Sequence, residues 1–107
     1  MDIKKLAENI GIKEQDYLEI LDLFVRTTSS DLNRLQAAMK EGAIQKVIER
    51  AHSIKGAAIN MCLMEISEKA KEIEINARNH RLDGAIEAIR HIKERMNQIT
   101  QSINGKE

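Results

Sequence analysis

Apolar residues recur with a helical period along almost the whole of this chain. The clearest run, between residues 14 and 41, has spacings of three, four and seven residues between Leu18, Leu21, Val25, Leu32, Leu35 and Met39. This spacing places apolar side chains on one face of an α-helix. The chain contains no proline, the residue that most strongly interrupts helices. At about 1.5 Å per residue, the predicted helix is roughly 40 Å long.

Four further segments share this periodicity. We expect a short helix over residues 2–9 with Asp2 as its N-cap, and longer helices over 43–61, 63–79 and 83–103. Asp83 is the expected N-cap of the last helix, Ile86 the first residue of its apolar stripe, and Gly42 the expected end of the long helix. Long amphipathic helices joined by short turns bury their stripes most simply in a bundle. The sequence therefore predicts one all-α domain over residues 1–107, an antiparallel up-down four-helix bundle with a short extra N-terminal helix.

Composition excludes several classes of function. Lys and Arg number 17, as do Asp and Glu, so the formal net charge is zero and a broad nucleic-acid surface is not expected. No apolar run approaches the roughly 20 residues that a membrane span needs. The N-terminus lacks a signal-peptide pattern, and Cys62 is the one cysteine, which is typical of a reducing compartment. We therefore expect a cytoplasmic protein that binds neither nucleic acid nor membrane.

Gly56 lies inside the helix expected over residues 43–61, where a glycine costs about 1 kcal/mol relative to alanine. Either it lets two helices pack closely, or it leaves room for another molecule. His52 precedes it by one turn and falls about 110° from the centre of the apolar stripe, so its ring is expected to be exposed. Gln45, Glu49 and Ile59 fall on the same side of the helix. This placement favours the second interpretation.

The His52 side chain suits nucleophilic chemistry. A histidine is substantially neutral near pH 7, and a neutral ring nitrogen can attack an electrophile. Lys55, three residues further on, is placed to offset the charge of a phosphoryl group on that ring. The other two histidines are given no functional role, because His91 lies opposite the apolar stripe of its helix and His80 lies near a helix end.

The residues around His52 resemble the signature of the histidine-containing phosphotransfer (HPt) domains of phosphorelays. In the stretch Ala51-His-Ser-Ile-Lys-Gly-Ala-Ala58, a hydrophobic residue, a lysine and a glycine follow the histidine by two, three and four positions, and small residues come next. The order and lengths of the expected helices are also similar to those of the family over essentially the whole chain. Many members have a second glycine ten residues after the histidine, where this chain has Cys62.

The resemblance implies a specific role for each of these residues. His52 would accept a phosphoryl group from an aspartyl phosphate of a response-regulator receiver domain and pass it to another receiver. Lys55 would stabilise the phosphoryl charge, and Gly56 would leave room for the receiver. The expected docking face consists of Gly56 with Gln45, Glu49, Ile59 and, on the long helix, Leu23.

The resemblance also implies which components the partners supply. They are receiver domains and a sensor (hybrid) histidine kinase, and Mg²⁺ is expected on the receiver, so this chain needs no metal or cofactor of its own. The chain is expected to be a monomeric phosphocarrier rather than an enzyme, since 107 residues leave no place for an ATP-binding domain.

Three alternatives remain at this point. The chain could be a helical-bundle interaction module that transfers no phosphoryl group. Glu49 and His52 have the E-x-x-H spacing of di-iron bundles, although the second copy that such a site requires is missing. A kinase dimerisation domain would have an acidic residue directly after the histidine and a proline further on, whereas this chain has Ser53 and no proline.

Overall fold

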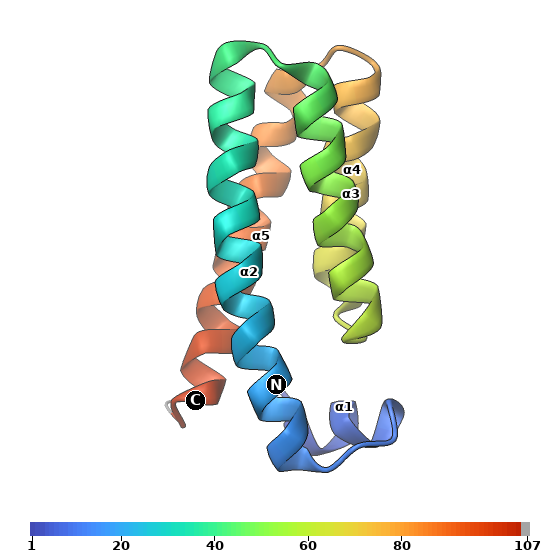
Figure 1. Cartoon of the computed structure of the whole chain (residues 1–107), viewed down its shortest axis with the longest axis vertical. Helices are drawn as coiled ribbons and strands as arrows, with labels where there is room; N and C mark the ends of the chain where they lie inside the picture. Colours follow the sequence, from blue (N-terminus) through green and yellow to red (C-terminus); the bar gives the residue numbers. More distant parts are fainter. Residues whose placement is uncertain (106–107) are drawn as a thin grey trace.

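The computed structural model describes residues 1–105, and all regular structure within that range is helical (Figure 1). The elements are α1 (Ile3–Asn9), α2 (Glu14–Glu41), α3 (Ile44–Asn60), α4 (Met64–Arg78), the short 3₁₀ helix η1 (Leu82–Gly84) and α5 (Ala85–Ile103). The predicted all-α class is therefore confirmed. None of the helices in residues 1–105 is long and apolar enough to cross a bilayer.

The helices α2 to α5 run up and down in turn, and α1 packs against the lower end of α2 (Figure 1). Each helix contacts the next one along the chain, and α5 returns to lie beside α2. The bundle therefore has four helix–helix interfaces, which we call seams. The α3/α4 seam lies opposite the α2/α5 seam. This confirms the predicted antiparallel four-helix bundle with an extra N-terminal helix.

Tyr17 connects the start of α2 to the end of α3 through a hydrogen bond. Its ring is fully buried, and its hydroxyl donates a hydrogen bond of 2.9 Å to the carbonyl oxygen of Met61. Burial, with a smaller contribution from the nearby Cys62, raises the pKa of Tyr17 to about 12. The hydroxyl therefore stays protonated and keeps donating this bond at any physiological pH.

The turn from α3 to α4 requires a left-handed residue, and Cys62 supplies it with a φ of 58°. The amide of Leu63 donates to the Ala58 carbonyl at 2.8 Å and that of Cys62 to the Ile59 carbonyl at 3.0 Å, which together form a Schellman motif. Glycine adopts this conformation without a Cβ penalty. The glycine that the family resemblance leads us to expect at position 62 would therefore fit this backbone conformation.

The helix ends confirm two expectations and correct a third. The Asp2 side chain caps α1 by accepting from the amide of Lys5, and Gly42 ends α2 with a φ of 70°. Asp83, however, is not the N-cap of α5. It lies within η1, a turn closed by a 3.0 Å bond from the amide of Gly84 to the Arg81 carbonyl, and α5 begins only at Ala85.

Ile86 was also placed wrongly, because it is not part of the core. It is 61% exposed at the first turn of α5, whereas Ile89, one turn later, is buried. Its neighbour Ala85 is fully buried, and at about 100° per residue Ile86 points away from the core that Ala85 faces.

Candidate functional site

His52 lies midway along α3, and its side chain is 67% exposed, as predicted from its angle to the apolar stripe. The opposite face of the same helix is fixed in the core, where Val47, Ala51, Ile54 and Ala58 are fully buried. The imidazole is therefore open to solvent but is carried by a rigid element.

A carboxylate from α4 lies against this ring. Oε2 of Glu74 is 3.5 Å from Nδ1 of His52. Lys55 Nζ donates to Glu74 Oε1 at 2.9 Å, and Arg78 Nη2 donates to Glu74 Oε2 at 3.0 Å. The Glu74 side chain is only 9% exposed, so this cluster of one histidine, one carboxylate and two cations forms a partly buried network across the α3/α4 seam.

The two cations keep Glu74 ionised. Burial alone would raise the pKa of the carboxyl, but hydrogen bonds from Lys55 and Arg78, with the nearby charges of Lys55 and His52, outweigh burial and lower the pKa to about 2. At neutral pH the carboxylate cancels one of the two cationic charges. The cluster then retains one excess positive charge beside the imidazole, which favours the approach of an anion.

The carboxylate also faces one of the two ring nitrogens, Nδ1. A proton on Nδ1 can interact with Glu74, and this tautomer leaves the lone pair of the imidazole on Nε2. Nε2 has no hydrogen-bond partner within residues 1–105. In that tautomer the unprotonated nitrogen is the one that does not face Glu74.

Gly56 is not needed for packing inside the chain. A Cβ built on it would meet no atom within 4 Å, and its backbone is ordinary α-helix. The interpretation in which Gly56 lets two helices approach each other is therefore wrong. Open space remains beside the ring of His52, one turn away.

The other predicted docking residues share this exposed face of α3. Gln45 and Glu49 are exposed in the two turns before His52, and Ile59 is exposed two turns after it. On α2, Leu23 is also exposed, so α1 does not cover it, and Ile20 is exposed one turn earlier. Both α2 and α3 therefore expose apolar side chains toward the end of the bundle where α2 begins and α3 ends.

Sequence reasoning missed Glu74 and Arg78. The signal that could have found Glu74 is its place in the apolar stripe of α4, where Ala70, Ile73 and Ala77 are fully buried and Glu74 occupies the fourth inward position. A charged residue at such a position requires partners. Arg78 follows it by four residues, the spacing at which side chains on a helix meet.

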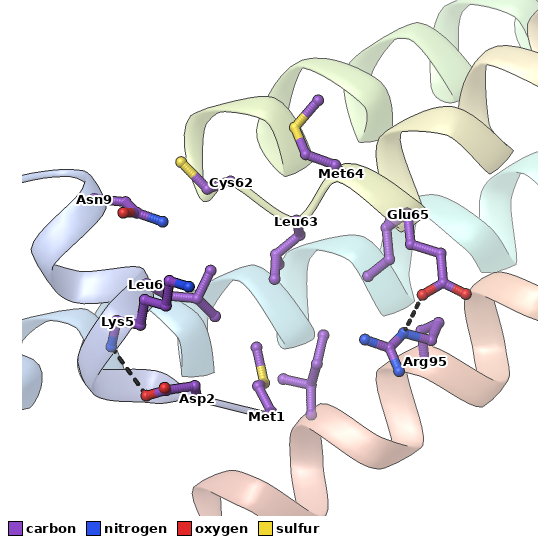
Figure 2. Close-up of a pocket in the computed structure, with 12 residues that line it drawn as sticks. Met1, Asp2, Lys5, Leu6, Asn9, Cys62, Leu63, Met64, Glu65 and Arg95 are labelled. Carbon is purple, nitrogen blue, oxygen red and sulfur yellow. Dashed lines mark hydrogen bonds and ion pairs between the residues drawn. The ribbon is translucent and has the colours of Figure 1, made fainter.

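The cluster is not part of a cavity. A hollow of about 340 Å³ lies between α1, the α3–α4 turn and α5, and its lining includes Leu63 and the ion pair between Arg95 and Glu65 (Figure 2). His52 does not line it. Within residues 1–105, no three His, Cys, Asp or Glu side chains are grouped so as to hold a metal ion. An exposed nucleophile on the side of a helix suits a macromolecular partner better than a small substrate.

The fold and the site together define a class of protein, a helical bundle that presents an oriented, exposed histidine beside cationic side chains. The family model for the Hpt domain matches residues 19–102, and the chain belongs to this family. It is therefore a histidine phosphotransfer protein of a phosphorelay. Members of the family carry phosphoryl groups between receiver domains and kinases and are not themselves kinases.

One solved structure illustrates the similarity. The crystal structure of histidine-containing phosphotransfer protein B (HptB) from Pseudomonas aeruginosa PAO1 matches with a TM-score of 0.82 and 29% sequence identity. The match covers 94% of this chain and 88% of that chain. No curated protein sequence matches the chain.

Proposed function

We propose that His52 is the residue that accepts and donates the phosphoryl group. Nε2 attacks the phosphorus of an aspartyl phosphate on a receiver domain, the N–P bond forms, and the bond to the aspartate oxygen breaks and leaves a carboxylate. The same steps in reverse deliver the group to a second receiver. The observation that supports this proposal best is the orientation of the ring, with Nδ1 at Glu74 and Nε2 unpartnered.

Glu74 acts as a positioning residue and as a charge partner. When Nε2 bonds to phosphorus, the imidazole that retains its Nδ1 proton becomes cationic. The carboxylate beside Nδ1 stabilises that positive charge, and its contribution grows as the bond forms. Glu74 therefore favours the transfer step as well as the starting tautomer.

Lys55 and Arg78 supply the positive charge for the phosphoryl oxygens. Phosphoryl transfer has a loose transition state, so positioning and charge stabilisation dominate catalysis. Both cations bind Glu74 in the resting state, within reach of the ring that will carry the phosphoryl group. We propose that Mg²⁺ comes with the receiver, so this chain contributes no metal or cofactor.

The receiver docks over the exposed side of α3. Gly56 leaves its active-site loops room to reach Nε2, Ile59 and Leu23 supply apolar contact, and Gln45 and Glu49 supply polar contact. We infer that the chain works as a monomer, in the cytoplasm, with receivers and a sensor histidine kinase as its partners, and that it does not hydrolyse ATP.

The test is phosphoryl transfer from a receiver labelled on its aspartate. The chain should become labelled with an acid-labile phosphoramidate, and His52→Gln should abolish the label. His91→Gln is the matched control and should behave as the unchanged protein does. Label on the His52→Gln protein would overturn the assignment. Binding of the receiver without any label on the unchanged chain would favour the alternative, an interaction module without phosphotransfer.

A further inference from the structure

A groove runs along the α2/α5 seam, on the opposite side of the bundle from the His52 cluster. It has a volume of about 330 Å³ and lies between Gln36, Met39 and Lys40 of α2 and Ile86, Ile89 and Lys93 of α5. We call it the α2/α5 groove. Figure 1 shows the two helices that form its walls side by side.

The floor of the α2/α5 groove is apolar. Ile89 is buried at its base, and Met39 is half-buried on the facing wall. Ile86 stands at its edge and is the most exposed of the large apolar side chains in residues 1–105. Exposed apolar surface of this kind commonly marks an interaction site when polar residues surround it.

The charge around the groove has one sign. Its lining residues include Lys40, Arg90 and Lys93 but no acidic residue. Arg90 is compensated by Glu87 and Glu94 on its own helix. Lys40 and Lys93, one from each wall, form no ion pair within residues 1–105. An apolar floor is thus flanked on both sides by an uncompensated cation, although the chain as a whole is neutral.

We propose that the α2/α5 groove binds an acidic amphipathic helix of a partner protein. The apolar stripe of such a helix would pack on Met39 and Ile86, and carboxylates on its two flanks would reach Lys40 and Lys93. A convex helix can fill a hollow whose base is buried Ile89, whereas a flat bilayer surface cannot reach that base. This surface is distinct from the proposed phosphotransfer site and does not depend on it.

A second copy of the chain fits the groove less well. The chain has an exposed apolar surface of its own on α2, formed by Ile20 and Leu23, but the neighbouring Asp22 is already paired with Arg26. Placing that surface in the groove of another copy makes a head-to-tail contact, which produces rings or open filaments rather than a closed dimer. The seam geometry instead allows a separate partner to occupy the groove while a receiver engages His52.

The experiment uses a designed helical peptide of about 18 residues, long enough to form a helix on binding, with leucines at i, i+3, i+4 and i+7 flanked by glutamates. Backbone amide NMR of the full chain should show shifts at residues 36–40 and 86–93 and little change at His52. The double variant Lys40→Glu/Lys93→Glu should weaken binding about tenfold or more, and a peptide with lysines in place of the glutamates should restore it.

Exposed isoleucines provide a matched pair of variants. Ile86→Ser should weaken binding, whereas Ile75→Ser, on α4, should not. The proposal is overturned if no peptide-dependent shifts occur at the groove, or if the charge swap restores nothing. It is equally overturned if the groove residues instead mediate concentration-dependent self-association or binding to anionic vesicles.

Discussion

Oε2 of Glu74 lies 3.5 Å from Nδ1 of His52, although the two residues belong to different helices. Lys55 and Arg78 hold the carboxylate in place from either side. The ring that carries the proposed chemistry thus lies beside a partly buried network that joins α3 to α4, and four predictions follow from this network and from Gly56 and Cys62 near it.

Replacing Glu74 should slow phosphoryl transfer through the orientation of the ring. Hydrogen-bond partners that orient metal-bound histidines contribute roughly 10- to 100-fold, and we expect an effect of similar size for Glu74. Glu74→Gln retains an oxygen that can accept from Nδ1 and should lie near the lower end of this range, with Glu74→Ala near the upper end. Transfer kinetics measure the rates, and ¹⁵N NMR of the imidazole measures the tautomer. Unchanged rate and tautomer in Glu74→Ala would show that the contact is only structural.

Glu74 should also make stability depend on pH. Because its folded-state pKa, about 2, is lower than the ordinary value of 4.5, the ionised carboxylate stabilises the fold above pH 4.5. This contribution should decline as pH falls from 4.5 through 2. Urea unfolding of the unchanged chain and of Glu74→Gln should therefore show a difference in unfolding free energy that shrinks over this window. A constant difference would contradict the role given to the two cations.

Gly56→Ala should make the domain more stable but slow phosphoryl transfer. Because a Cβ there meets no atom within 4 Å and the residue is helical, the change should raise the free energy of unfolding by up to about 1 kcal/mol. The melting temperature would then rise by at most about 4–8 °C. Transfer from a receiver should nevertheless become slower, and more so for Gly56→Val. A variant that transfers as fast as the unchanged chain would show that the receiver does not use this space.

Cys62→Gly should stabilise the domain without affecting transfer. The left-handed conformation costs a residue with a Cβ about 1 kcal/mol or more, and glycine avoids that cost. Part of the gain is lost to the greater freedom of glycine in the unfolded chain. Cys62→Ala retains the strain and is the control. Thermal unfolding of the two variants compares them directly, and equal stabilities would mean that the turn is not strained.

The sequence predicts the helices well because their boundaries depend on local signals. The bounds expected for α2 are those found, since Gly42 closes the helix where the apolar spacing stops. The exposure of His52 follows from its angle to the core stripe of one helix. Both properties are determined within a few turns of chain.

Properties that depend on the placement of a second helix are harder to predict from the sequence. Glu74 contacts His52 across a seam, and helical periodicity does not give the rotation of one helix relative to the next. Asp83 is not the N-cap because the tight turn at η1 delays the start of α5, and Ile86 is exposed because the core face of α5 passes through Ala85 and Ala88 instead. A rule based on capping residues alone cannot anticipate that delay.

The mid-helix position of His52 has a consequence for the kinetics of the relay. A side chain fixed on a packed helix and open to solvent needs no lid to move before it reacts. Encounter with the partner then needs no preceding conformational step, so its rate should fall as solvent viscosity rises and should change with ionic strength through electrostatic steering.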